Sequence, residues 1–139
     1  MAFHVKRKIH FYDCDAAGVL FFARIYELCH SAYEELIEDF NLKEDYWNNE
    51  DYIVPIIKSE ASYHKPLKYG ELVTIEIKVS QLKSSSFELN YICRNEKNEV
   101  TNKIRTVHVF VGKKDWKKRE LPVGVFKGFE KHLVGKRVI

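Results

Sequence analysis

The most informative segment of this 139-residue chain is residues 11–36, which read FYDCDAAGVLFFARIYELCHSAYEEL. From Phe22 onward, apolar residues recur at spacings of three and four, and most charged residues fall between them. That period is typical of an amphipathic helix with a wide apolar stripe. The stripe comprises Phe22, Ile25, Cys29, Ala32, Leu36 and Phe40. We therefore predict a helix of about five turns, long enough to form the centre of a small domain.

The sequence on either side of this helix alternates between apolar and polar residues, as β-strands do. One strand is expected before the helix, at residues 4–12, and the segment DCDAAG (13–18) ends it. Four strands are expected after the helix, at 52–63, 73–79, 87–93 and 107–111, with a hairpin loop at 95–98. Short connections favour antiparallel neighbours. We predict an α+β fold, a curved antiparallel sheet of about five strands wrapped around one long central helix.

Two parts of this prediction are less regular. In the last strand, Val107, Val109 and Val111 alternate as a buried face. Ile104, His108 and Phe110 interrupt the polar face, so we expect this strand to be buried on both sides. The C-terminal stretch 122–139 is ambiguous, because its apolar residues fit one face of a short helix while its glycines disfavour helix. No repeat or linker divides the chain. We expect one domain over residues 1–139.

Composition excludes several classes of protein. The apolar share of 45% and the net charge of +3 fit a packed globule rather than a disordered chain. Three widely separated cysteines suggest neither a disulfide framework nor a zinc site. The longest apolar run, residues 19–23, is far shorter than the roughly 20 residues that a membrane-spanning helix needs. With no secretory signal pattern at the N-terminus, we expect a cytoplasmic protein without membrane contact.

Charge is segregated along the chain. Residues 103–119 hold seven basic side chains against the single acid Asp115, whereas residues 34–51 hold eight acids and one lysine. A basic stretch of this kind binds phosphates or nucleic acid, or it simply forms a solvated loop. The stretch contains Trp116, which suits base stacking, but no nucleic-acid recognition motif. We therefore expect no nucleic-acid partner.

The segment between the first strand and the helix has the residues of a hydrolytic site. Asp13 and Asp15 lie two residues apart at a predicted strand end, so both side chains can point to one face. The helix that comes next presents unpaired backbone N–H groups, which can hold the developing oxyanion while a carboxylate attacks or activates water. The alternative is purely structural, with either aspartate capping the helix or closing a turn. The spacing alone favours the cap.

The whole run resembles the signature of hot-dog fold proteins of the 4-hydroxybenzoyl-CoA thioesterase class. The shared pattern is an apolar strand end, D-x-D-x-x-G, a hydrophobic pair and then the long helix, and the likeness extends over residues 4–122. Within the class the chain is most similar to 1,4-dihydroxy-2-naphthoyl-CoA thioesterases. The similar segments are Phe21–Phe22, LCHSAYE (28–34) and HVFV (108–111) followed by basic residues up to Leu121–Pro122.

The resemblance implies roles for particular residues. Asp15 matches the catalytic acid, as nucleophile or general base, the backbone N–H of Phe22 matches the group that polarises the thioester carbonyl, and Gly18 matches the turn. Phe22 replaces a histidine of short-chain acyl-CoA thioesterases, which favours an aromatic acyl group between Phe21 and Phe22. Further substrate-binding candidates are His64, Lys65 and Lys83. The class needs no metal and no cofactor, since coenzyme A is part of the substrate.

Several functions remain open from the sequence. The leading hypothesis is hydrolysis of an aromatic acyl-CoA, best matched by 1,4-dihydroxy-2-naphthoyl-CoA of menaquinone or phylloquinone biosynthesis. A 4-hydroxybenzoyl-CoA or broad acyl-CoA thioesterase is the alternative within the class, and a non-catalytic acyl-CoA binding module is the alternative outside enzymes. The resemblance also implies a homo-oligomer, a dimer or a dimer of dimers. An uncovered edge strand would make such pairing natural.

Overall fold

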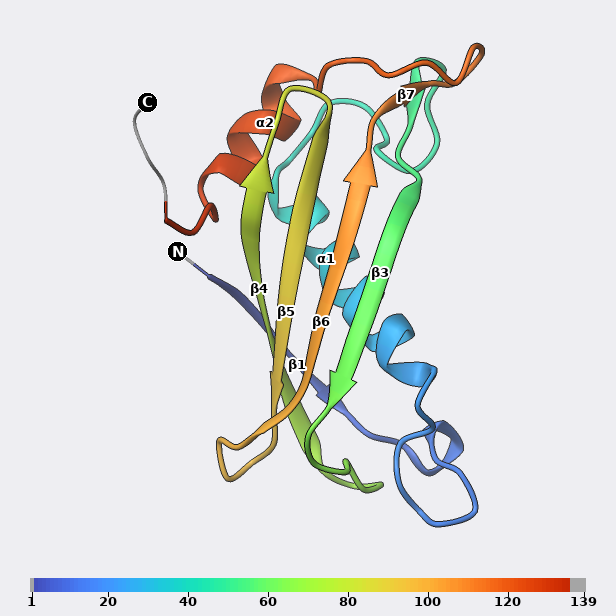
Figure 1. Cartoon of the computed structure of the whole chain (residues 1–139), viewed down its shortest axis with the longest axis vertical. Helices are drawn as coiled ribbons and strands as arrows, with labels where there is room; N and C mark the ends of the chain where they lie inside the picture. Colours follow the sequence, from blue (N-terminus) through green and yellow to red (C-terminus); the bar gives the residue numbers. More distant parts are fainter. Residues whose placement is uncertain (1, 136–139) are drawn as a thin grey trace.

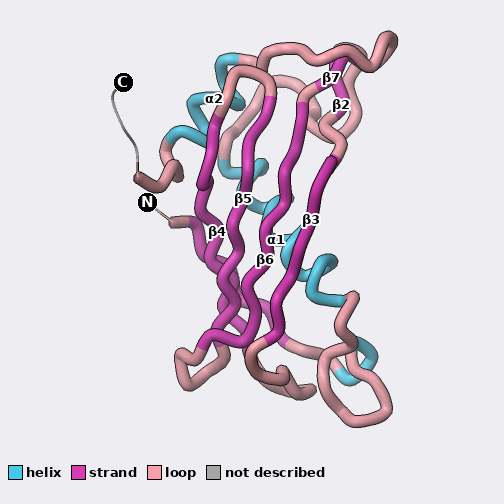
Figure 2. The backbone as a smooth tube through the Cα atoms, in the orientation of Figure 1, coloured by secondary structure: helices cyan, strands magenta, loops and turns pink. Residues whose placement is uncertain are grey.

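The computed structural model describes residues 2–135, and its main feature is one antiparallel sheet with a helix packed across one face (Figure 1). The sheet order is β1-β4-β5-β6-β3, and a separate two-stranded ribbon pairs β2 with β7. Figure 2 shows how the long strands run side by side, with β3 at one edge of the sheet. The strands are β1 (Phe3–Lys8), β2 (Tyr52–Ile53), β3 (Ile56–Tyr63), β4 (Leu72–Leu82), β5 (Ser86–Arg94), β6 (Val100–Val109) and β7 (Val111–Gly112). The helices are the 3-10 turn η1 (Phe11–Asp13), α1 (Arg24–Asp39) and α2 (Val123–Glu130).

The central strands β4 and β5 follow the predicted alternation closely. Every second residue of β4 from Val73 to Val79 is fully buried, and the residues between them are partly exposed. The same holds for β5 from Phe87 to Cys93. Because alternate side chains point to opposite faces of a strand, one face of the sheet is apolar and faces α1. This part of the sequence prediction is confirmed.

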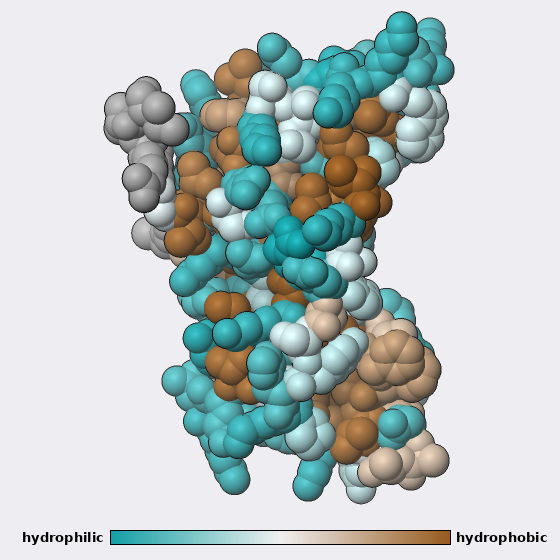
Figure 3. Space-filling model, in the orientation of Figure 1, coloured by the Kyte–Doolittle hydropathy of each residue, from teal (hydrophilic) through white to brown (hydrophobic). Residues whose placement is uncertain are grey.

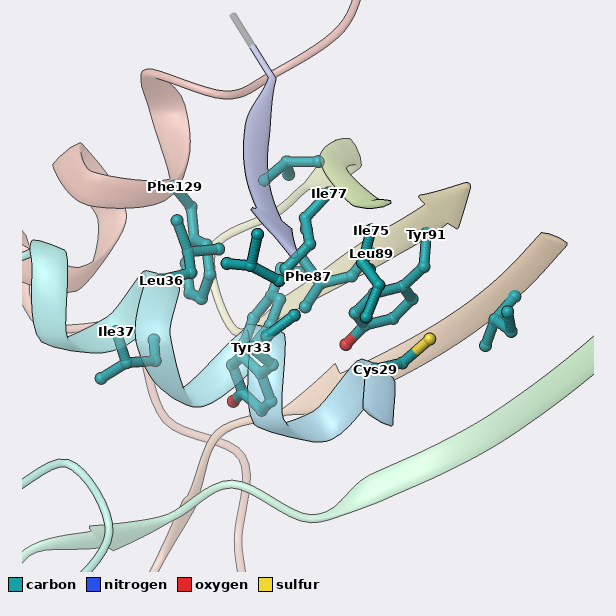
Figure 4. Packing of buried hydrophobic residues seen from close by; sticks show 14 of the residues in the cluster. Cys29, Tyr33, Leu36, Ile37, Ile75, Ile77, Phe87, Leu89, Tyr91 and Phe129 are labelled. Carbon is teal, nitrogen blue, oxygen red and sulfur yellow. The ribbon is translucent and has the colours of Figure 1, made fainter. Parts of the chain in front are cut away.

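Helix α1 covers that apolar face with its own buried stripe (Figure 4). Tyr33 and Leu36 of the helix pack against β4 and β5, and Figure 4 shows Tyr33 directed toward Phe87. The helix spans 16 residues and is shorter than the predicted five turns. It begins after Phe22 and ends before Phe40, which are therefore not helical stripe residues, although Phe40 still packs on the core. The buried helix residues are Ile25, Cys29, Ala32, Tyr33, Leu36 and Ile37.

The ambiguous C-terminal stretch forms the second helix, α2. Phe129 is fully buried, with its ring stacked on Phe87 at 4.1 Å between ring centroids and edge-on to Phe40 at 5.0 Å. A Cβ added at Gly128 would lie 2.6 Å from the Phe40 ring. The glycine that weakened the helix prediction is thus the residue that allows α2 to approach the end of α1. Residues 136–139 of this stretch lie outside the described residues.

Three strand predictions were wrong in detail. The first strand ends at Lys8, because the chain then turns into η1, where the Asp13 carboxylate accepts the His10 backbone N–H at 2.9 Å. The predicted strand 52–63 is divided into β2 and β3 around Pro55, which lacks the N–H that a ladder needs. The small β2–β7 ribbon was not expected as a separate sheet.

The expectation that the last strand is buried on both sides is confirmed at residues 108–111, which are all buried, but the strand, β6, begins earlier than predicted, at Val100. Its helix-facing side carries Asn102, Ile104, Thr106 and His108, all buried, whereas Val107 is only partly buried. Two of the buried polar residues, Thr106 and His108, are hydrogen-bonded to each other, and only the second ring nitrogen of His108, Nδ1, has no partner among the described residues. Thr106 Oγ1 lies 2.7 Å from His108 Nε2, and the His108 ring stacks on Phe87 at 4.5 Å.

Candidate active site

The D-x-D segment forms a small hairpin rather than a strand end. Cys14 and Leu20 form an antiparallel bridge, and the Asp15 N–H donates to the Val19 carbonyl at 2.9 Å. The turn between them is closed by the Gly18 N–H, which donates to the Asp15 carbonyl at 3.0 Å. Gly18 has a φ of 79°, a left-handed conformation that favours glycine. The predicted turn role of Gly18 therefore has a direct backbone reason.

The two aspartates of this hairpin lie in different environments. Asp13 is 8% exposed, and its carboxylate is engaged with the His10 N–H, which is the structural role that the sequence left open. Asp15 is exposed, and its Oδ1 accepts the Ala17 N–H at 2.9 Å, while its other carboxylate oxygen has no partner within residues 2–135. The expectation that both carboxylates share one face is thus wrong, because Asp13 belongs to η1. Asp15 keeps a carboxylate oxygen available for chemistry.

Phe22 lies where this hairpin meets the start of α1. Its carbonyl accepts the Tyr63 hydroxyl at 2.7 Å, which ties the helix start to the end of β3. Its backbone N–H makes no hydrogen bond to the residues described here, and it lies in the turn just before the Ala23 N-cap of α1. The rings of Phe21 and Phe22 lie 5.0 Å apart, and both are exposed. Figure 3 shows apolar side chains gathered at the lower right, the region of this segment.

A pocket of about 380 Å³ opens beside Phe22. It brings together three of the predicted site residues, Phe22, His64 and Lys65, from segments more than 40 positions apart. The hairpin reaches the pocket through Val19 and Leu20, and the Leu20 N–H is held by the Leu67 carbonyl at 2.7 Å. The full lining is Val19, Leu20, Phe22, Tyr63, His64, Lys65, Pro66, Leu67 and Asn102.

His64 and Lys65 are exposed at this pocket, on the turn that follows β3. Both backbone N–H groups donate to the Thr101 carbonyl of β6, at 2.8 and 3.2 Å. The Lys65 ammonium pairs with Glu99 at 2.6 Å, and this hydrogen bond lowers the pKa of the Glu99 carboxyl. The pocket mouth therefore carries a cation that is held in place but remains open to solvent.

Lys83 lies elsewhere in the fold. It sits in the hairpin between β4 and β5, and Figure 1 places this hairpin next to α2, at the opposite end of the long axis from the loop before α1. Within one chain Lys83 therefore does not join Phe22, His64 and Lys65. The sequence does not specify which strand ends lie together. The assignment of Lys83 to the substrate site therefore rested only on the likeness of a local motif.

The basic stretch 103–119 is likewise divided by the fold. Arg105 on β6 is engaged by Glu60 and Glu88, each at 2.6 Å. Arg105 lowers the pKa of Glu60, and hydrogen bonds from Ser80 and then Arg105 outweigh burial and lower the pKa of Glu88. Lys113 and Arg119 donate to backbone carbonyls of residues 49 and 51 at 2.8 Å. The lysines at 113–118 lie in the loop after β7, at the end of the molecule away from the Asp15 hairpin (Figure 1).

Comparison with known proteins shows the family and the fold of this chain. Residues 9–129 match the sequence model of the thioesterase-like superfamily. The chain belongs to the thioesterase-like superfamily. A 1,4-dihydroxy-2-naphthoyl-CoA hydrolase from Crocosphaera subtropica is 32% identical over 124 residues, which cover 86% of this chain and 90% of that protein. One from Nostoc punctiforme is 33% identical over 124 residues, covering 88% and 82% of the two chains.

Solved structures extend the likeness to the fold. A 1,4-dihydroxy-2-naphthoyl-CoA thioesterase from Synechocystis superposes with a TM-score of 0.86 at 22% identity, covering 93% of this chain and 96% of that one. A Staphylococcus aureus protein described in complex with CoA superposes with a TM-score of 0.87 at 10% identity, covering 100% and 95%. At these identities the structures show the shared fold. The hot-dog thioesterase arrangement expected from the sequence is thereby confirmed.

One pocket residue of this thioesterase-like chain was missed from the sequence. Asn102 is 3% exposed and lines the pocket, and its Oδ1 has no hydrogen-bond partner among the residues described. The sequence signal for Asn102 was its position two residues before Ile104, which places both side chains on the same, inner face of β6. The alternating valines of the same strand form a stronger pattern, and they obscure this signal.

Two further observations concern metal binding and membrane spanning. Within residues 2–135, no group of three or more His, Cys, Asp or Glu side chains is arranged to hold a metal ion. None of the helices in that range is long and apolar enough to cross a membrane.

Proposed function

We propose that this chain hydrolyses 1,4-dihydroxy-2-naphthoyl-CoA to the free acid and coenzyme A. The observation that carries the proposal is the pocket beside Phe22. There a helix start with a free N–H and a hairpin bearing an available carboxylate lie next to a mostly apolar cavity. The names of the relatives from Crocosphaera and Nostoc support the same reaction. An apolar pocket with few polar groups suits an aromatic acyl chain.

Two polar groups act on the thioester in the proposed reaction. The thioester carbonyl oxygen accepts a hydrogen bond from the Phe22 N–H, which stabilises the negative charge that develops on it. The Asp15 carboxylate either attacks the carbonyl carbon or removes a proton from the attacking water. If Asp15 attacks, the C–S bond breaks to leave a mixed anhydride on Asp15, and water then hydrolyses that anhydride and frees the carboxylate. If Asp15 is the base, water adds to the carbonyl directly and the C–S bond breaks. In both cases water supplies the hydroxyl of the acid and the proton with which coenzyme A leaves as the thiol. This route needs no metal ion and no further cofactor.

Coenzyme A is proposed to leave the pocket past His64 and Lys65. Their exposed position at the mouth, and the positive charge of Lys65, suit a phosphate-bearing chain that extends into solvent. Lys83 and the lysines at 113–118 lie too far along the chain's long axis to help in the same subunit. We propose that any contact they make with coenzyme A comes from a second copy.

A second copy is proposed to pair through β3. This strand is an edge of the sheet, and nearly all its residues are exposed, including Ile56, Ile57 and Tyr63. Unpaired edges favour association, and pairing by twofold symmetry would bring a partner close to the pocket. We place this homo-oligomer in the cytoplasm, where the three free cysteines, Cys14, Cys29 and Cys93, suit a reducing environment.

The test is a panel of thioesters assayed with the purified chain. 1,4-Dihydroxy-2-naphthoyl-CoA is expected to give the highest kcat/KM, ahead of 4-hydroxybenzoyl-CoA, benzoyl-CoA and short acyl-CoAs. Highest activity on a short acyl-CoA would overturn the substrate assignment. Saturable binding of the aromatic thioester with no turnover of any member of the panel would replace the enzyme by a binding module.

A further inference from the structure

We propose that Asn102 is a specificity-determining residue that hydrogen-bonds a ring hydroxyl of the aromatic acyl group. The inference rests on the proposed function and adds a residue and a recognised group to it. Asn102 lies on the inner face of β6, in register with Tyr63 of β3 on one side and Cys93 of β5 on the other. Tyr63 in turn bonds the Phe22 carbonyl, so Asn102 belongs to the strand segment beside the helix start.

Two buried side-chain atoms within residues 2–135 have no hydrogen-bond partner, the Asn102 Oδ1 and the His108 Nδ1, and of these two residues only Asn102 lines the pocket beside Phe22. Thr101 donates to the Cys93 carbonyl at 3.2 Å, and Thr106 is bonded to His108. The Asp13 carboxylate accepts a backbone N–H. The Asn102 Oδ1 has no such partner in residues 2–135, although the side chain lies in the wall of a cavity. A buried amide left unsatisfied destabilises a fold, so its presence calls for a compensating role.

The depth of the pocket indicates which part of the substrate Asn102 would meet. His64 and Lys65 are exposed and form the mouth, whereas Asn102 and Leu67 are 3% and 2% exposed and lie deeper. With the thioester carbonyl at the Phe22 N–H and coenzyme A at the mouth, the acyl ring occupies the deep part. There the other lining groups are mostly apolar, so Asn102 is the amide available to a ring substituent.

The chemistry of the amide fits a hydroxyl group. An asparagine side chain carries both an acceptor and donors, so it can accept from a phenolic O–H or donate to its oxygen. A site built around such a bond rejects an analogue that lacks the hydroxyl, because the buried polar group is then left unpaired. A purely apolar pocket would distinguish the two ligands only weakly.

The experiment compares two substrates and two variants. Wild type, Asn102→Leu and the matched control Thr101→Val are assayed with 1,4-dihydroxy-2-naphthoyl-CoA and with 2-naphthoyl-CoA, which lacks both hydroxyls. The specificity ratio is kcat/KM for 1,4-dihydroxy-2-naphthoyl-CoA divided by kcat/KM for 2-naphthoyl-CoA. Asn102→Leu is expected to lower this ratio about tenfold or more, mainly by slowing hydrolysis of the hydroxylated substrate. Thr101→Val removes a buried hydroxyl one residue away and is expected to leave the ratio unchanged.

The melting temperature provides an independent readout. Because the Asn102 Oδ1 has no partner to lose, Asn102→Leu is expected to fold with an unchanged or higher Tm, whereas Thr101→Val is expected to lower it. An Asn102→Leu variant that loses stability and slows both substrates equally would show a structural role and overturn the proposal.

A binding measurement separates this inference from the proposed function. If wild type hydrolyses no thioester, the proposed function fails, and titration calorimetry with 1,4-dihydroxy-2-naphthoate and 2-naphthoate then decides the role of Asn102. Tighter binding of the hydroxylated acid by wild type, with the preference lost in Asn102→Leu, would support it. Absence of any preference in wild type, in both assays, would overturn it.

Discussion

Aromatic side chains gather at both ends of this molecule, but in opposite environments. At the end with α2, Phe87, Phe110 and Phe129 are buried and pack ring against ring. At the end with the Asp15 hairpin, Phe11 and Phe22 are 73% and 64% exposed. The residue types are the same, so hydrophobicity alone does not separate them.

The difference shows which aromatic residues stabilise the fold and which are available to a ligand or a partner. Burial of a phenylalanine ring stabilises a fold by about 2 to 3 kcal/mol, and the rings near α2 already have that contribution. Those near Asp15 would gain it only on binding, which is typical of interaction sites. The end near α2 is thus a packed core, whereas the end near Asp15 leaves its aromatic rings available to a ligand or a partner.

The largest expected effect removes the chemistry at the open end. Asp15→Asn is expected to lower kcat about 10³-fold or more, because an amide neither attacks a thioester nor accepts a proton from water. The hairpin should persist, since the new side-chain oxygen can still accept the Ala17 N–H. Steady-state hydrolysis of 1,4-dihydroxy-2-naphthoyl-CoA measures the change.

The matched control is Asp13→Asn, two residues away. Its side-chain oxygen can likewise keep the bond to the His10 N–H, so we expect near wild-type kcat. Equal losses in both variants would mean that the segment matters as a turn, and a fully active Asp15→Asn would remove that residue from the mechanism.

A pair of phenylalanine substitutions tests the contrast between the two ends directly. Phe129→Ala is expected to lower the free energy of unfolding by about 3 to 4 kcal/mol, because it empties a fully buried site. Phe22→Ala is expected to change it by less than about 0.5 kcal/mol, since that ring is mostly exposed. Urea denaturation of each variant provides the values.

The same pair is then compared in the thioesterase assay at a temperature where both are folded. Phe22→Ala should lower kcat/KM on the naphthoyl substrate about tenfold, whereas Phe129→Ala should affect it little. A large stability loss in Phe22→Ala would show that the open end belongs to the core after all.

The last prediction concerns how the stability of the buried end, near α2, depends on pH. Burial, with a smaller contribution from the charge of His30, lowers the pKa of His108 to about 3. The unfolded chain binds that proton near pH 6.5 and the folded chain does not, so stability is full above pH 6.5 and falls as pH drops toward 3. Between pH 6.5 and 5.0 this histidine should contribute a loss of about 2 kcal/mol in the free energy of unfolding.

Denaturation of His108→Gln at both pH values measures that contribution, since the variant cannot titrate there. The glutamates whose pKa values are lowered titrate below this window. Equal slopes in wild type and His108→Gln would contradict the assignment.

Much of the fold could be predicted because local patterns and burial agree. The alternation in β4 and β5 predicted their buried faces, and the apolar period of residues 25–36 predicted α1. The prediction failed where a local hydrogen bond competes with a regular element. Asp13 turned the expected strand into η1, and the Thr106–His108 bond made a polar face acceptable inside.

For the site, the local sequence was enough to predict the turn and that a helix comes after it, although α1 begins at Arg24 and not at Phe22. Asp15, Gly18 and Phe22 lie within eight residues, so their relation depends on local backbone geometry that a motif records. The folded chain alone shows that His64 and Lys65 meet Phe22, that Lys83 does not, and that Asn102 lies in the same pocket. The physical reason is that strand order and register bring distant segments together, and no local pattern in one sequence specifies which strand ends will be neighbours.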